Sequence, residues 1–148
     1  MSITPPPFLV REFAQYVSTE IERAKQALIH ELMALGEETV NIVKTDRRYK
    51  DQTGNLTSSV GYAIVVDGAL VSSGGFRQEK STATQGVSVG TSYIQSLAAQ
   101  YPTGITLIVV AGMNYAAYVE TKGYGGMTNG EQWAKAAAAD LLKNITGK

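Results

Sequence analysis

The stretch that decides the fold reads Val60-Gly61-Tyr62-Ala63-Ile64-Val65-Val66-Asp67-Gly68-Ala69-Leu70-Val71-Ser72. Every second residue from Val60 to Val66 is large and apolar, and a period of two is typical of a β-strand. Asp67-Gly68 then separates two β-prone runs. Because both positions of the favoured two-residue turn need a positive φ, Asp-Gly is a strong hairpin signal. The sequence therefore predicts a β-hairpin over residues 59–72.

A short segment leads into this hairpin and reads Thr53-Gly54-Asn55-Leu56-Thr57-Ser58-Ser59-Val60. Gly54 supplies a backbone conformation that other residues resist, and Asn55–Ser59 is suited to one turn of helix. We expect Leu56 and Val60 to point inward, and the serine hydroxyls to bond nearby backbone groups. The segment is thus predicted to shape the chain where it turns into the sheet.

A long helix is predicted over residues 7–44. Its apolar residues recur at steps of three and four, which is one continuous stripe. The part before Gly36, Phe8–Leu35, has about 28 residues and at 1.5 Å per residue would be roughly 42 Å long, whereas a compact domain of this size has a radius of gyration of only about 15 Å. Two alternatives follow. The helix bends at Gly36 and packs on its own sheet, or it projects and needs a partner, of which another copy is the simplest.

The second half of the chain contains three further predicted parts. Residues 74–104 form an insertion, with a long exposed loop over Gly74–Gly90 and a short helix over Thr91–Tyr101. Residues 105–120 form a strand region, where 105–111 is nearly all apolar and suits a central strand. A C-terminal helix is predicted over 128–146, because Thr128 and Glu131 match a capping box. The whole, residues 1–148, is predicted to be a single α+β domain with a small antiparallel sheet and the C-terminal helix packed on it.

The composition offers little for catalysis. The 148 residues contain no cysteine and one histidine, His30, and 13 basic residues balance 13 acidic ones. Thiol chemistry is excluded, a zinc site would need carboxylates in place of most of its usual ligands, and neutral charge gives no footprint for nucleic acid or a membrane. A nucleophile at Ser58 or Ser59 lacks a base placed by spacing. We therefore expect no catalytic, cofactor-binding or metal-binding residues.

The N-terminus has neither a basic region nor an apolar core of the kind found in signal peptides. The apolar runs are far shorter than the roughly 20 residues that span a bilayer. We expect a protein made in the cytoplasm, with no membrane partner.

Two segments together resemble a known family. The first is Thr53–Val60, and the second reads Tyr115-Ala116-Ala117-Tyr118-Val119-Glu120, which suits a strand or a short helical turn. Preceded by a long amphipathic helix and followed by a C-terminal helix, they resemble the neck and tail-completion proteins of long-tailed bacteriophages, also described as head–tail joining or minor tail proteins. The family pattern is Thr-Gly-x-Leu-x-x-Ser-Ile/Val, followed later by Tyr-Ala-x-Tyr-Val-Glu-x-Gly.

The resemblance implies a structural virion protein that acts by ring assembly at the head–tail junction or tail terminus. Its implied partners are copies of itself and the connector, tail terminator or tail tube. Tyr115, Tyr118, Glu120 and the loop 77–84 are the implied contacts. Two other hypotheses stay open: a small hydrolase or nuclease that uses Glu120 with Asp46 or Asp51, and a cellular protein-binding module.

Overall fold

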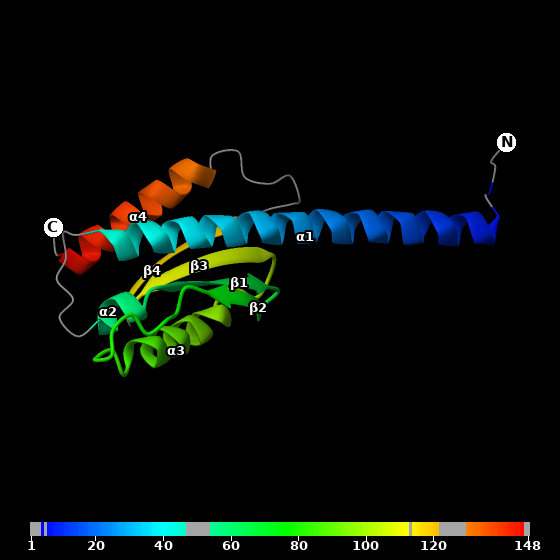
Figure 1. Cartoon of the computed structure of the whole chain (residues 1–148). Helices are drawn as coiled ribbons and strands as arrows, with labels where there is room; N and C mark the ends of the chain where they lie inside the picture. Colours follow the sequence, from blue (N-terminus) through cyan, green and yellow to red (C-terminus); the bar gives the residue numbers. More distant parts are fainter. Residues whose placement is uncertain (1–3, 5, 47–53, 113, 122–129, 147–148) are drawn as a thin grey trace.

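The computed structural model describes residues 4, 6–46, 54–112, 114–121 and 130–146. Its elements follow one another along the chain in the order helix, short helix, hairpin, helix, two strands, helix. Their bounds are α1 Pro7–Thr45, α2 Asn55–Ser58, β1 Gly61–Val66, β2 Ala69–Gly74, α3 Gly86–Ala98, β3 Ile105–Ala111, β4 Tyr115–Thr121 and α4 Gly130–Thr146. The predicted α+β fold with a long first helix is therefore confirmed (Figure 1).

Helix α1 runs through Gly36 without a break, so of the two alternatives the one with a bend at this residue is wrong. The reason is packing. A Cβ atom at Gly36 would lie 2.6 Å from the Tyr62 ring, so the glycine lets the helix pass close to β1. Helix α1 extends well beyond the rest of the molecule at its N-terminal end (Figure 1). Of the two alternatives predicted from the sequence, a bent helix and a projecting one, the structure shows the projecting helix.

The four strands form one antiparallel sheet in the order β2-β1-β3-β4, so β3 is central as predicted. Val66 pairs with Ala69 across the hairpin, which leaves Asp67 and Gly68 as its two turn residues. Both have positive φ, 49° and 84°, which is the geometry of a type I′ turn. The Asp67 carboxylate also accepts a hydrogen bond from the Gly104 N–H at 2.9 Å, which joins this turn to the start of β3.

Alternating side chains of the strands build a core on each face of the sheet. On one face, Tyr62, Ile64, Leu107 and Val109 pack against α1 and α4. On the other face, the residues between them pack against α3. This second set consists of Ala63, Val65, Ile108 and Val110. Figure 1 shows the resulting three layers, with α1 and α4 on one side of the sheet and α3 on the other.

The insertion differs from the prediction at both ends. Strand β2 continues to Gly74, and α3 begins at Gly86 and ends at Ala98, rather than covering Thr91–Tyr101. The long loop therefore shortens to residues 75–85. The prediction places Gly86 and Gly90 in this loop. Both are instead buried in α3, where close contacts exclude a side chain.

Helix α4 packs on α1 and on β3 and β4. Its buried residues recur at helical spacing along one side of the helix. They are Ala134, Ala137, Ala138, Leu141 and Leu142. The predicted capping residue Thr128 lies outside the described residues. Glu131, its predicted capping partner, is 3.3 Å from Lys135, in an exposed pair that contributes little to stability.

Tyr62 gives the fold a predicted pH dependence. Its ring is 2% exposed, and burial, together with a hydrogen bond to the Glu37 carboxylate, raises the pKa of Tyr62 to about 12 from 10.0. Because the native pKa is the raised one, the stabilisation is complete below pH 10 and is lost between pH 10 and 12. The shift is worth at most about 3 kcal/mol.

We expect Tyr62→Phe to remove this part of the alkaline destabilisation. Urea unfolding at a series of pH values from 8 to 12, in the variant and the parent protein, measures it. Parallel curves for the two proteins across this range would contradict the prediction.

Candidate assembly surfaces

The segment before the hairpin forms a junction between distant parts of the chain. Gly54 is buried, and its backbone is in the left-handed conformation, with φ 82°. This confirms the prediction that the position needs a glycine. The Asn55 side-chain oxygen accepts hydrogen bonds from the backbone N–H groups of Gln85 and Gly86, both at 3.0 Å. These groups begin α3, where helical backbone leaves N–H groups unpaired. Asn55 therefore caps a helix that starts thirty residues further along the chain.

The two serines of the same segment are buried and hydrogen-bonded to backbone groups. The Ser58 hydroxyl accepts a bond from the Glu79 N–H at 2.9 Å. The Ser59 hydroxyl donates to the Leu56 carbonyl at 2.5 Å and accepts from the Gly112 N–H at 2.8 Å. These bonds tie α2 to the loop 75–85 and to the end of β3. They support the structural interpretation of both serines.

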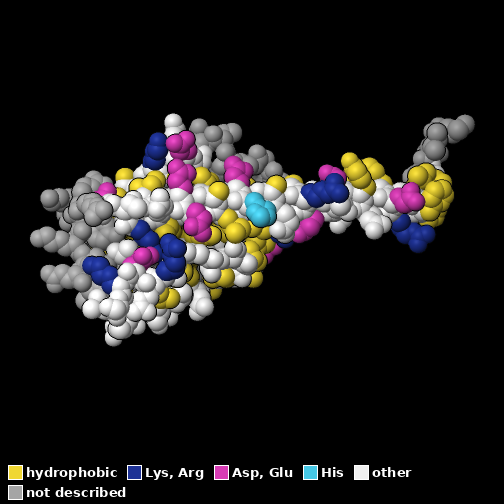
Figure 2. All heavy atoms as spheres, in the orientation of Figure 1, with side chains coloured by type: hydrophobic (Ala, Val, Ile, Leu, Met, Phe, Trp, Pro, Cys, Tyr) yellow, Lys and Arg dark blue, Asp and Glu magenta, His cyan; other side chains and the backbone are white. Residues whose placement is uncertain are grey.

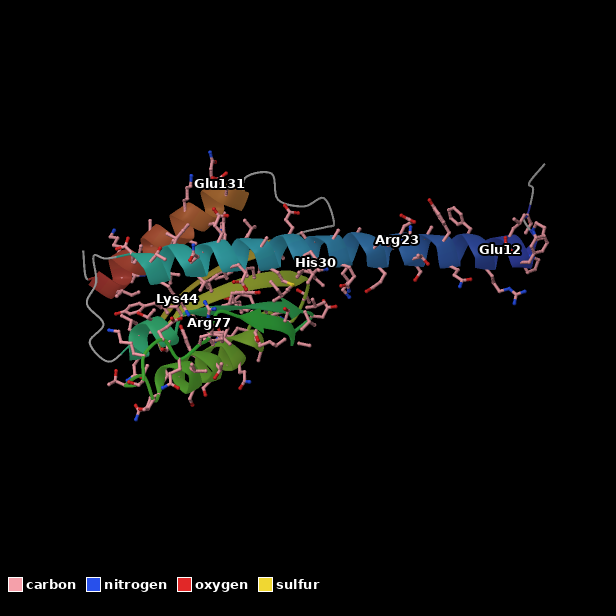
Figure 3. The ribbon with its side chains drawn as sticks, viewed as in Figure 1. Glu12, Arg23, His30, Lys44, Arg77 and Glu131 are labelled. Atoms are coloured by element: carbon pink, nitrogen blue, oxygen red, sulfur yellow. The ribbon has the colours of Figure 1, made fainter. Side chains whose placement is uncertain are left out.

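Leu56 and Val60 have different surroundings. Val60 is fully buried, as expected. Leu56 is half-buried and helps to line a shallow depression of about 200 Å³ between α2, α3 and the end of β3. Thr53 lies outside the described residues. His30, on α1, is exposed, and it is labelled in Figure 3.

The loop 75–85 is anchored by contacts that the sequence did not reveal. The Lys44 ammonium donates to the Gly75 carbonyl and forms an ion pair with Glu79 at 2.7 Å. Phe76 fills the space over Gly61 and Gly90, where a Cβ atom would lie 2.5 and 2.6 Å from its ring. The loop is thus anchored to the body at Gly75, Phe76 and Glu79, although most of its residues, Arg77 among them (Figure 3), are exposed as expected.

The second signature is an edge strand, β4, which settles the choice between strand and helical turn. Because successive side chains point to opposite faces, its signature residues separate. Tyr115 packs into the core under α1 and α4. Tyr118 and Glu120 lie on the α3 face and are exposed. The structure therefore brings Tyr118 and Glu120 together but not Tyr115.

Tyr118 belongs to an aromatic surface that β4 shares with α3 and with Tyr101, which follows α3. Its ring is 54% exposed and lies 5.0 Å from the Tyr101 ring, centroid to centroid. Burial, and then the proximity of Tyr118, Glu120 and Tyr93, raises the pKa of Tyr101. We call this group the tyrosine surface. Its members are Tyr93, Leu97, Tyr101, Ala116, Tyr118 and Glu120.

The carboxylate pair that a hydrolase would need is not assembled from Asp46 and Glu120. Asp46 follows the end of α1, near Lys44 and Gly75 at the Gly61 end of β1. Glu120 pairs with Thr106 near the opposite end, about 13 Å further along the strands, on the face away from α1. Asp51 lies outside the described residues. Within the described part of the chain, no three His, Asp or Glu side chains are grouped as metal ligands would be.

The N-terminal part of α1 is a second exposed surface. Every side chain of Pro7–Arg23, which we call the arm, is exposed, whereas Leu28 further along is only 2% exposed. Large apolar residues cover one side of the arm, as the yellow groups in Figure 2 show. They are Phe8, Leu9, Val10, Phe13, Tyr16, Val17 and Ile21, between 37% and 69% exposed. Such a continuous apolar surface is typical of an interaction site.

Comparison with known proteins gives no match to a family model, to a curated protein or to a solved structure. No helix among the described residues is long and apolar enough to cross a membrane.

Proposed function

We propose that this chain is a structural subunit of the head–tail junction or tail terminus of a long-tailed bacteriophage, which works by ring assembly. The observation that carries the proposal is the arm. A helix that leaves its body with an apolar side exposed gains stability when that side is covered, so the chain is built to bind another protein.

The resemblance in the two signature segments supports the phage assignment. Gly54, Asn55 and Ser59 of the first segment organise the start of α3 and the end of β3, which is a reason for the family pattern to recur. Tyr118 and Glu120 of the second segment offer an exposed edge-strand surface. On this proposal the partners are further copies, together with the connector, tail terminator or tail tube, and the protein resides in the virion.

Purified particles from the strain that carries this gene provide the test. We expect mass spectrometry to detect the chain in intact tailed particles, and gold-labelled antibody to mark the junction of head and tail. Portal, capsid and tail genes should lie beside its gene. Absence of the chain from purified particles, with unrelated genes on both sides, would overturn the proposal in favour of a cellular binding module.

A further inference from the structure

The two faces of the sheet are covered unequally in the described part of the chain. Four strands at about 4.8 Å are roughly 19 Å wide, and a helix with its side chains is about 10 Å across, so a full face takes two helices. One face has two, α1 and α4. The other has α3, which packs on β1, β2 and β3. The strip of this face over β4 is where Tyr118 is 54% exposed.

The arm has the dimensions of a helix that would fill this strip. Its 17 residues, Pro7–Arg23, are about 26 Å long, and the seven residues of β4 extend about 23 Å. Its apolar side would lie on the rings of Tyr118 and Tyr101. Helices gain most of their stability from packing an apolar side, and the arm has no such packing within the described part of its own chain.

The arm does not reach this strip in its own molecule. Helix α1 is unbroken from Pro7 to Thr45 and packs on the opposite face of the sheet, so the arm extends away from the body, as Figures 1 and 2 show. The occupant must come from another molecule. We propose that the tyrosine surface of one copy binds the arm of a second copy.

The tyrosine surface has little charge of its own. Glu120 is the one charged side chain in α3 and β4 together, so the tyrosine surface is apolar with an acidic end. Within the arm, Glu20 is paired with Arg23 at 3.2 Å, and Arg11, two residues before Phe13, lies on the opposite side of the helix. The proposed contact is therefore one between apolar side chains, with Glu120 at its edge.

The contact joins two different surfaces, so it is head-to-tail. Such contacts form a closed ring when the rotation between copies closes, and a filament when it does not. This inference deepens the proposed function and rests on it for the biological setting of the ring. An arm-to-arm pair would instead be two-fold, would stop at a dimer and would leave the tyrosine surface uncovered.

Cross-linking tests the contact directly, because the chain has no cysteine of its own. The full-length variants Phe13→Cys and Tyr118→Cys are purified separately, one with a tag that changes its mass, then mixed and oxidised. We expect a mixed disulfide dimer. Gln15→Cys is the matched control, two residues from Phe13 on the other side of the helix. Because disulfides need Cβ atoms within about 4.5 Å, its yield with Tyr118→Cys should be about tenfold lower.

Complementation separates the head-to-tail contact from its alternatives. The arm variant Phe13→Glu/Val17→Glu and the surface variant Tyr118→Glu should each sediment as monomers, with unchanged unfolding of the body. Their mixture should form a one-to-one complex, since the surface variant keeps an intact arm and the arm variant keeps an intact tyrosine surface. Self-cross-linking of Phe13→Cys alone would overturn the inference in favour of arm pairing. Failure of the mixed disulfide would overturn it too, even if the chain is found in particles.

Discussion

Replacing Leu32 by alanine is expected to lower the free energy of unfolding by about 2–5 kcal/mol. Leu32 is fully buried in the core between α1, the sheet and α4. Truncation removes apolar contacts and leaves a cavity that rigid neighbours fill poorly. Urea unfolding followed by circular dichroism measures the loss. The dependence of the unfolding free energy on urea concentration is given one common value for both proteins.

The matched control is a substitution at Ile21, which lies on the same helix and in the same apolar stripe. Ile21 is 45% exposed on the arm, so Ile21→Ala should change the stability of the monomer by no more than about 0.5 kcal/mol. The contrast locates the boundary at which α1 leaves the body. A loss at Ile21 as large as that at Leu32, under conditions where the protein is monomeric, would show that the arm packs on its own chain.

Replacing Gly90 by alanine should destabilise the protein by about 1–3 kcal/mol, which is the usual cost of overpacking a well-filled core. The added Cβ would lie 2.5 Å from the Ser59 carbonyl oxygen and 2.6 Å from the Phe76 ring. The Ser59 carbonyl is part of the backbone and cannot rotate away as a side chain does. Helix α3 must therefore move away from the segment that contains Ser59. Helix propensity alone predicts the opposite sign, a gain of about 1 kcal/mol.

Ser92→Ala is the control for this second substitution. Ser92 is exposed on the same helix, where alanine has the better propensity, so this variant should be neutral or slightly more stable. Thermal and urea unfolding of both variants decide the sign. A more stable Gly90→Ala protein would mean that α3 is not held against Ser59 as the structure has it.

Local signals predicted the elements well. The alternation around Ile64 and the Asp67-Gly68 turn were enough for the hairpin, because strand period and turn chemistry are properties of neighbouring residues. The apolar run at 105–111 was correctly predicted to be central, since a strand buried on both faces lacks alternation. Helix α3 was predicted too short, because Gly86 and Gly90 weaken its helical pattern for a reason that lies in another segment.

The candidate surfaces were also predicted only in part from the sequence. Tyr118 and Glu120 were predicted as contact residues from their motif, but Tyr101, which completes their surface, is brought there only by the packing of α3. The capping of α3 by Asn55 also escaped the sequence, because the two segments are joined by a hydrogen bond across thirty residues. No local pattern marks such a bond.

The sequence by itself determined the nature of every element except β4, and the apolar stripe along α1, because these depend on backbone preferences and periodicity within a few residues. Only the tertiary structure decided which part of that stripe is covered. Leu28 and Leu32 are buried under the sheet, while Phe13 and Val17 are exposed on the arm. The stripe is equally apolar in both parts, and the difference arises because the sheet is too short to cover the whole helix.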